Sequence, residues 1–358
     1  MPYQLYVFGS NGEGQLGIPA ADIVNIPTVA QSWPSHESIE TVHGGDNHTL
    51  VHSSTGHVYF TGDNRKGQFG VKEGMADRIE GFETSELDVS FCAATCQSSA
   101  YFLKEHSRAP LKSTLVTDGA AFWGELGIGT ISNTPGAADK MRVQTLPHRV
   151  IDFAAGGWHY VAILTNGEVW GWGKSRLDQL GLGLSSQQRI LRPTVVDEDI
   201  PFQPVKVVCG KEFTYLVSEP ALGKHHLLGR DKFSLRSSMP KHIPGWKQIG
   251  ATWNAIFVLF EDGSMTAWGK NDMWKLLPEN LPPIMQMAVG SEHVLAITTN
   301  GELISWGWGK HGNCGDLTKL RDKVKNDMVN GFWNDISIPG KIEFVGAGFC
   351  TSFVLTNV

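Results

Sequence analysis

Charged residues are scarce in this sequence, and this shortage excludes several classes of protein. Asp, Glu, Lys and Arg make up 18% of the 358 residues, below the roughly 25% of an average soluble domain. Together with 41 glycines and 12 tryptophans, this excludes a disordered tail and a coiled coil. Thirty basic residues stand against 36 acidic ones, a net charge of −6. The chain therefore lacks the basic excess of a dedicated DNA-binding protein, and we expect no direct DNA binding.

Long hydrophobic runs and regularly spaced cysteines are also missing. The longest apolar run, 255–260, is far shorter than the roughly 20 residues of a membrane-spanning helix. We therefore expect no membrane span and no targeting segment. The cysteines are odd in number and irregularly spaced: Cys92, Cys96, Cys209, Cys314 and Cys350. This pattern favours reduced thiols in a protein of the cytoplasm and nucleus over a disulfide framework.

What the sequence does contain is an internal repeat. A Gly-x-x-His phrase is followed by an apolar stretch, a glycine turn, an aromatic-glycine pair and a Gly-Gln-Leu-Gly loop. The two outer glycines keep a constant separation in three copies (45 and 62, 156 and 173, 290 and 307) and a slightly longer one in two others (210 and 229, 250 and 269). Such self-similarity indicates a repeat architecture. The glycine of the aromatic pair gives seven copies: Gly9, Gly62, Gly124, Gly173, Gly229, Gly269 and Gly307.

The local chemistry of each copy predicts β-hairpins. Short apolar segments are separated by Asn-Gly or Asp-Gly pairs, which favour two-residue type I′ turns because both central residues take positive φ. These pairs end at Gly119, Gly167, Gly263 and Gly301. The third copy has lost part of its loop, and 104–112 has the character of an insertion. Radially stacked units of this kind form a β-propeller.

The two ends of the chain complement each other. The final copy stops at Asn357, where a hairpin turn is due, and the missing half, 5–9, opens the chain. We predict an all-β, seven-bladed β-propeller over 1–358, a single domain closed by strands from both termini, which removes an exposed sheet edge. Leu317, Leu320, Val324 and Met328 are spaced like one face of a helix, so we also predict a short helical insertion near 316–330. It would pack on the rim or serve as a docking arm.

No motif in the sequence points to catalysis or to a cofactor. Residues 12–17 match Gly-x-Gly-x-x-Gly, but a dinucleotide fingerprint requires a helix to follow, and none is predicted. His48, His159 and His293 share one repeat position, so they lie on different blades and cannot form a local metal cluster. We predict a protein that is not an enzyme, with no catalytic residue, cofactor or metal of its own.

The Gly-x-x-His loops should lie together on one face of the disc, because they occupy the same place in each blade. They carry aromatic and acidic residues, a combination suited to protein binding, although Trp158 and Trp253 could instead wedge between blades. The last repeat adds Trp308 and a Gly-Phe-Trp turn. The predicted partner-binding residues are Trp158, Glu212, Phe213, Trp253, Glu292, His293, Trp308, His311 and Trp333.

These motifs, at these offsets, resemble the regulator-of-chromosome-condensation repeat family of seven-bladed propellers. Segments 8–12, 290–293 and 306–315 resemble a fungal branch of that family more closely. The resemblance implies a non-catalytic heterodimer partner of a small metal-binding (CSL zinc-finger, zinc- or iron-binding) diphthamide-biosynthesis protein. That heterodimer would support Elongator-dependent modification of wobble uridine in transfer RNA, and diphthamide synthesis on elongation factor two.

Two alternatives remain open at this point. The founding member of the family is a guanine-nucleotide exchange factor for a small GTPase. The net charge of −6 and the worn third copy speak against this function, because the resemblance associates exchange with a basic tail and an intact third repeat. A ubiquitin-ligase adaptor is the other alternative, and no further domain in the sequence supports it.

Overall fold

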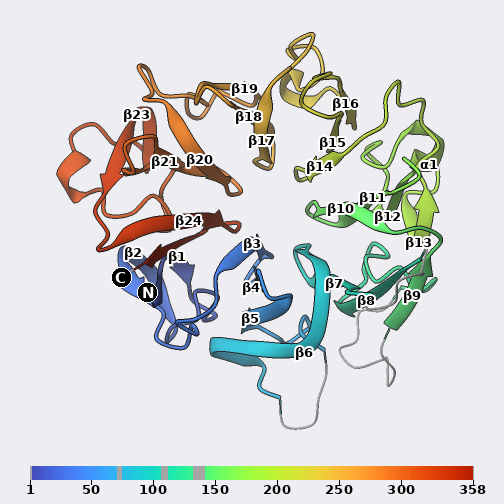
Figure 1. Cartoon of the computed structure of the whole chain (residues 1–358), viewed down its shortest axis with the longest axis horizontal. Helices are drawn as coiled ribbons and strands as arrows, with labels where there is room; N and C mark the ends of the chain where they lie inside the picture. The colour runs from blue at the N-terminus through green and yellow to red at the C-terminus, as the bar shows by residue number, and fades with distance from the viewer. Residues whose placement is uncertain (1, 71–74, 106–111, 132–141, 358) are drawn as a thin grey trace.

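The computed structural model describes residues 2–70, 75–105, 112–131 and 142–357, and Figure 1 shows them as small sheets around a central axis. The predicted all-β class is confirmed. Across the described ranges, the regular non-strand elements are one short helix, α1 (Leu182–Ser185), and two 3-10 turns, η1 (Lys232–Ser234) and η2 (Thr318–Leu320). None of the described helices has the length and hydrophobicity needed to cross a membrane. The five cysteines are free thiols.

Each group of paired strands around the axis is called a blade. The blade at the chain ends contains β1 (Tyr3–Asn11), β2 (Ala21–Val29), β24 (Lys341–Ala347) and β25 (Thr351–Asn357). The next sheet runs through β3 (Ile39–Gly44), β4 (His48–Ser53), β5 (His57–Asp63), β6 (Arg78–Ala94), β7 (Ser98–Leu103), β8 (Ser113–Gly119) and β9 (Arg142–Leu146). β6 serves two blades, since its first part pairs with β5 and its last part with β7.

The remaining four blades follow in chain order. One contains β10 (Val150–Ala155), β11 (His159–Leu164), β12 (Val169–Lys174) and β13 (Arg189–Val195). Two have three strands each, β14 (Lys206–Cys209) with β15 (Thr214–Val217) and β16 (His225–Leu228), and β17 (Trp246–Ala251) with β18 (Ala255–Phe260) and β19 (Met265–Gly269). The last contains β20 (Ile284–Val289), β21 (His293–Thr298), β22 (Leu303–Trp308) and β23 (Met328–Ile336).

Strands from the two ends of the chain pair in one blade. β1 lies between β2 and β25, and its antiparallel register with β25 runs from Tyr3 opposite Asn357 to Gly9 opposite Thr351. Figure 1 shows the N and C termini side by side in this blade. The pairing gives β1 and β25 partners on both edges, so neither is left as an open sheet edge.

The core consists of the interfaces between blades. The second strands, such as β11 and β21, are buried along their whole length, because both of their faces pack against neighbouring blades. The tryptophan of the aromatic-glycine pair locks adjacent blades in three places. The indole N–H of Trp172 donates to Glu125 O at 2.8 Å, that of Trp306 to Leu276 O at 2.9 Å, and that of Trp268 to Leu235 O at 3.0 Å. A buried indole needs such a partner.

The hairpin turns differ from the predicted type I′ turns. Gly167 N donates to Leu164 O at 2.9 Å, and Leu164 N donates to Glu168 O at 2.9 Å. Only the glycine of the Asn-Gly pair has positive φ, at 87°. This is the three-residue hairpin loop, a type I turn followed by a left-handed glycine. The same two bonds recur at Gly263 and Gly301. The prediction was wrong because Asn-Gly also suits the last two positions of this longer loop.

The third copy was predicted in the wrong register. Gly119, with φ 108°, lies opposite Ser98, just as Gly62 lies opposite His48. Gly119 therefore occupies the aromatic-pair position, not a hairpin turn, whereas Gly124 packs against Leu191. The predicted insertion at 104–112 falls in the connection between β7 and β8, and residues 106–111 of it lie outside the described part of the chain. Loss of the aromatic residue before Gly119 hid this register.

The predicted helical insertion near 316–330 was also wrong. The segment contains only η2, and β23 begins at Met328. Asn326 and Asp327 have φ values of 52° and 61°, and such left-handed residues cannot continue a right-handed helix. A helix of this length is also marginal in water without strong packing. The apolar spacing marks burial instead, since Leu317 and Val324 pack against the core of this blade.

Candidate functional site

The Gly-x-x-His loops gather at one end of the blades, and this end is called the loop face. It is formed by residues 45–47, 95–97, 156–158, 210–212, 252–254, 290–292 and 348–350, and by the turns after the third strands that adjoin them, such as 174–176 and 308–311. Backbone hydrogen bonds link these loops across blade boundaries. Donor and acceptor pairs are Lys211 N to Trp253 O, Trp253 N to Ser291 O, Ser291 N to Phe349 O, Asp46 N to Cys96 O, and Cys96 N to Gly157 O, all between 2.9 and 3.0 Å. These bonds fix the loops in two groups, one running from Lys211 to Phe349 and the other from Asp46 to Gly157.

The glycine and the histidine of each Gly-x-x-His loop are sterically matched. A Cβ on Gly290 would lie 2.2 Å from Cε1 of His293, and a Cβ on Gly156 the same distance from Cε1 of His159. The imidazole thus occupies the space that a side chain would need. Where threonine replaces the glycine, the matching residue is small, as in the pair Thr252 and Ala255.

The histidines join one blade to the next. Nε2 of His159 lies 3.0 Å from Oγ1 of Thr214, and Nε2 of His293 lies 3.0 Å from Oγ of Ser352. Because Thr214 donates its own proton to Gln179 O at 2.8 Å, it accepts from His159. Burial lowers the pKa of His159 and of His293 to about 3, so both are neutral at physiological pH.

A central cavity of about 360 Å³ runs along the axis. The innermost strand of each blade lines it, largely with glycine, alanine and valine, and a few polar residues such as His43, Lys206 and Gln248. At the loop face its wall includes Trp253, Ser291 and Phe349. Within the described ranges, no group of three or more His, Cys, Asp or Glu side chains could hold a metal ion.

The nine predicted partner-binding residues differ in how far they are exposed to solvent. Trp158, Glu212, Trp253 and Glu292 are partly exposed on the loop face. Phe213 and His293 are buried, 2% and 0% exposed, so they support the face from below and cannot contact a partner.

The three predicted residues of the last repeat do not all lie in the same place. Trp308 N donates to Glu292 O at 2.8 Å, and the Trp308 ring lies 5.1 Å from that of His311, so both residues belong to the loop face. Trp333 lies on β23, the outermost strand, where its indole N–H donates to Asp335. Trp333 therefore lies away from the other eight predicted residues.

Lys174 is the most important residue of the loop face that sequence reasoning missed. Its side chain is only 4% exposed, and its ammonium donates to Oε1 of Glu212 at 2.9 Å. It also lies 4.7 Å from the ring centre of Trp158 and 5.3 Å from that of Trp123. A signal existed in the sequence, because Lys174 directly follows the aromatic-pair glycine, as Trp308 does in the last repeat.

The two acidic residues of the predicted site have opposite environments. Burial alone would raise the pKa of Glu212, but the hydrogen bond and the charge of Lys174 hold it below the usual value. Burial raises the pKa of Glu292, against the opposing charge of Lys270. Glu212 also borders a cavity of about 300 Å³, together with Phe213, Trp253 and the segment 230–232.

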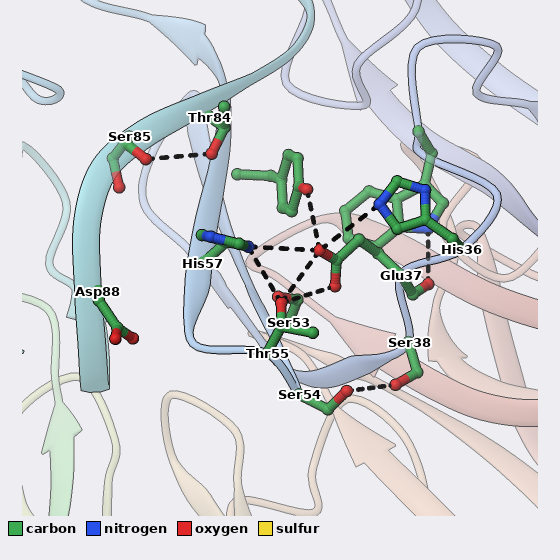
Figure 2. Close-up of polar contacts among 12 residues, drawn as sticks. His36, Glu37, Ser38, Ser53, Ser54, Thr55, His57, Thr84, Ser85 and Asp88 are labelled. Carbon is green, nitrogen blue, oxygen red and sulfur yellow. Dashed lines mark hydrogen bonds and ion pairs between the residues drawn. The ribbon is translucent and has the colours of Figure 1, made fainter. Parts of the chain in front are cut away.

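A second polar cluster lies at the opposite end of the blades, beside the β4–β5 hairpin. Figure 2 shows Thr55 and His57 pointing toward the buried carboxylate of Glu37. Thr55 donates to Glu37 at 2.9 Å, Tyr59 donates at 3.3 Å, and Nδ1 of His57 lies 3.3 Å away. Burial would raise the pKa of Glu37, but the hydrogen bonds from Thr55 and His57 lower it. The cluster ties the loop before β3 to this hairpin.

Comparisons with known proteins agree with the repeat. Residues 4–52, 150–179, 166–217 and 285–313 match models of the regulator of chromosome condensation (RCC1) repeat. The RCC1 repeat-containing protein C10F6.04 of Schizosaccharomyces pombe is 27% identical over 98% of both chains. Mouse E3 ubiquitin-protein ligase HERC2 is 26% identical over 99% of this chain, which spans only 8% of HERC2.

A solved structure shares the fold. Prp20p of Saccharomyces cerevisiae superposes with a TM-score of 0.77 at 18% identity, over all of this chain and 92% of Prp20p. At this identity the likeness concerns the fold alone. In its repeats, and over almost its whole length, the chain is thus similar to proteins with RCC1 repeats.

Proposed function

We propose that this protein is a non-catalytic interaction platform, a closed ring of seven blades whose loop face docks a protein partner. The observation that carries the proposal is the loop face itself, where Trp158 and Trp253 stay partly exposed on loops that backbone hydrogen bonds link to their neighbours. Tryptophan is enriched among residues that anchor protein interfaces. A preorganised backbone reduces the entropy lost when a partner binds.

The partner that we propose is the small CSL-type diphthamide-biosynthesis protein, as in the fungal branch that the sequence resembles. What supports it is the grouping of two segments that carry the resemblance: Glu292 from 290–293 and Trp308 and His311 from 306–315 are neighbours on the loop face. The metal and any electron transfer would belong to the partner. The pair would act in the cytoplasm and nucleus, supporting Elongator-dependent modification of wobble uridine and diphthamide synthesis.

Affinity purification of the full chain from its source cell, with identification of the stoichiometric partner, tests the proposal. The double variant Trp253→Ala with Glu292→Lys should abolish capture of the small metal protein while the melting temperature changes little. Trp170→Ala is the matched control, because Trp170 is a partly exposed tryptophan on β12 outside the loop face and should leave capture intact. Equal loss of folding and capture would show that Trp253 and Glu292 serve the core.

Guanine-nucleotide exchange is the alternative, and the fold likeness to Prp20p, whose reported structure concerns binding to Gsp1p and histones, is what supports it. We expect the purified protein not to accelerate nucleotide release from a nuclear small GTPase loaded with a fluorescent nucleotide. Clear acceleration would favour exchange over the docking role.

A further inference from the structure

A band of aromatic rings and cations crosses the loop face. Its rings are Phe122, Trp123, Trp158, Trp253 and Phe349, and its cations are Lys174, Arg176, Arg189 and Lys211. Near the axis, Nζ of Lys211 lies 4.3 Å from the centre of the Trp253 ring and 5.6 Å from that of Trp158. The Trp253 ring meets the Phe349 ring with centroids 5.4 Å apart. Four blades and the chain-end blade thus contribute to one surface.

The band continues outward through Lys174 to Trp123. The guanidinium groups of Arg176 and Arg189 lie 5.1 Å and 5.0 Å from the centre of the Trp123 ring. Arg189 also lies 5.0 Å from the ring of Phe122, which is 46% exposed. Cation–π contacts of this length are attractive and hold the cations against the rings.

The cations of the band differ in how their charge is balanced. Glu212 neutralises Lys174. Among the described residues, no ion pair joins Arg176, Arg189 or Lys211 to a carboxylate. Arg176 is exposed, and the other two are partly exposed. The charge of Glu125 acts on Arg189, and those of Asp46 and Glu292 act on Lys211, but none of these carboxylates forms an ion pair with them. Three cations are therefore oriented by aromatic rings and can each pair directly with a carboxylate of a ligand.

The same geometry favours an acidic protein over a single-stranded nucleic acid as the ligand of the band. A nucleic-acid platform needs free aromatic faces on which bases can stack. Here cations already cover those faces, three of them over Trp123 and two over Trp158. The net charge of −6 also opposes the counterion-driven binding of a polyanion. Carboxylates, by contrast, can meet arginine edge-on while the rings keep the guanidinium in place.

We propose that the aromatic–cation band binds an acidic segment of a protein partner, whose carboxylates pair with Arg176, Arg189 and Lys211. The inference rests on the docking role proposed above, but it does not depend on which protein is the partner. It assigns the partner a surface rich in Asp and Glu with apolar side chains between them, since the rings between the cations offer apolar edges.

The test compares charge reversals inside and outside the band in the full-length protein. Arg176→Glu, Arg189→Glu and Lys211→Glu change the band, and Lys66→Glu and Lys224→Glu are controls, because both lysines are exposed on loops outside the band. The probes are the purified small metal protein, an array of acidic peptides with aromatic residues, the same peptides with Asn and Gln for Asp and Glu, and fluorescent oligouridylate.

We expect each band reversal to weaken binding of the acidic peptides about tenfold and to reduce its salt dependence, with the controls unchanged. The amide peptides should bind weakly to every variant. Equal binding of acidic and amide peptides, equal effects of band and control reversals, or a preference for oligouridylate would each overturn the inference. If the metal protein fails to bind the wild type, the proposed partner is wrong, and the peptide array still tests whether the band binds acidic segments. If it binds all variants equally, the docking role stands and the band inference fails.

Discussion

Replacing Gly290 with alanine should destabilise the protein, because the new methyl group would collide with His293. The added Cβ would lie 2.2 Å from Cε1 and 2.4 Å from Nδ1 of the imidazole, and 2.7 Å from Gly348 O. The backbone at Gly290 does not have positive φ, so alanine meets no conformational strain there. Overpacking of a buried site costs about 1–3 kcal/mol, and we expect about 2 kcal/mol for Gly290→Ala.

The histidine should rescue this change when it is removed. His293→Ala alone loses the bond to Ser352, worth about 1 kcal/mol, and leaves a cavity that costs about 2 kcal/mol. In the double variant the methyl group added at position 290 would enter space that the imidazole has left, as Thr252 does beside Ala255 in another blade. We therefore expect a loss of about 4 kcal/mol instead of the roughly 5 kcal/mol that additivity would give, because the close contact with Gly348 O remains.

Guanidinium unfolding followed by tryptophan fluorescence gives the four free energies of unfolding that this double-mutant cycle needs. Gly12→Ala is the control, because a Cβ there would meet nothing within 4 Å and its φ is not positive; its stability should match the wild type. Additivity of the two single changes within about 0.5 kcal/mol would refute the steric match between the glycine and the histidine.

Two further predictions concern pH. Burial lowers the pKa of His159 to about 3, so the stability it contributes is present above the unfolded value of about 6.5 and is lost as the pH falls toward 3. His159→Phe copies Phe213 of another blade. As the pH is lowered from 6.5 to 4, the free energy of unfolding of this variant should fall less steeply than that of the wild type, with slopes that differ by about 1.4 kcal/mol per pH unit. An unchanged slope would count against a neutral buried imidazole. Burial raises the pKa of Glu125 to about 7, so its contribution is full below pH 4.5 and is lost as the pH rises through 7. Glu125→Gln should therefore stabilise the protein at pH 8 by about 2 kcal/mol. The glutamine can keep the backbone hydrogen bond, because Gln179 accepts the same type of bond at the equivalent loop position. No gain in stability at pH 8 would show that the carboxylate is not the destabilising group.

The repeat and the all-β class could both be predicted from the order of the amino acids. They follow from local patterns, because Gly-x-x-His, the aromatic-glycine pair and the hairpin glycines recur in every well-preserved copy. Local pattern also misled where two structures share one signal. Asn-Gly fits both types of short hairpin loop, and the spacing of Leu317 and Val324 marks burial as readily as it marks a helix.

The composition of the candidate site depends on how the blades pack. Lys174 and Trp158 meet within one blade, where Lys174 N donates to Trp158 O at 2.8 Å. Trp123 reaches Lys174 only because the neighbouring blade places its loop alongside. The same packing buries Phe213 and His293, at the fourth position of their loops, and leaves Trp253, at the second position of its loop, partly exposed. A repeat motif specifies the shape of its own loop; the neighbouring blade determines whether a given side chain of that loop faces solvent or the core.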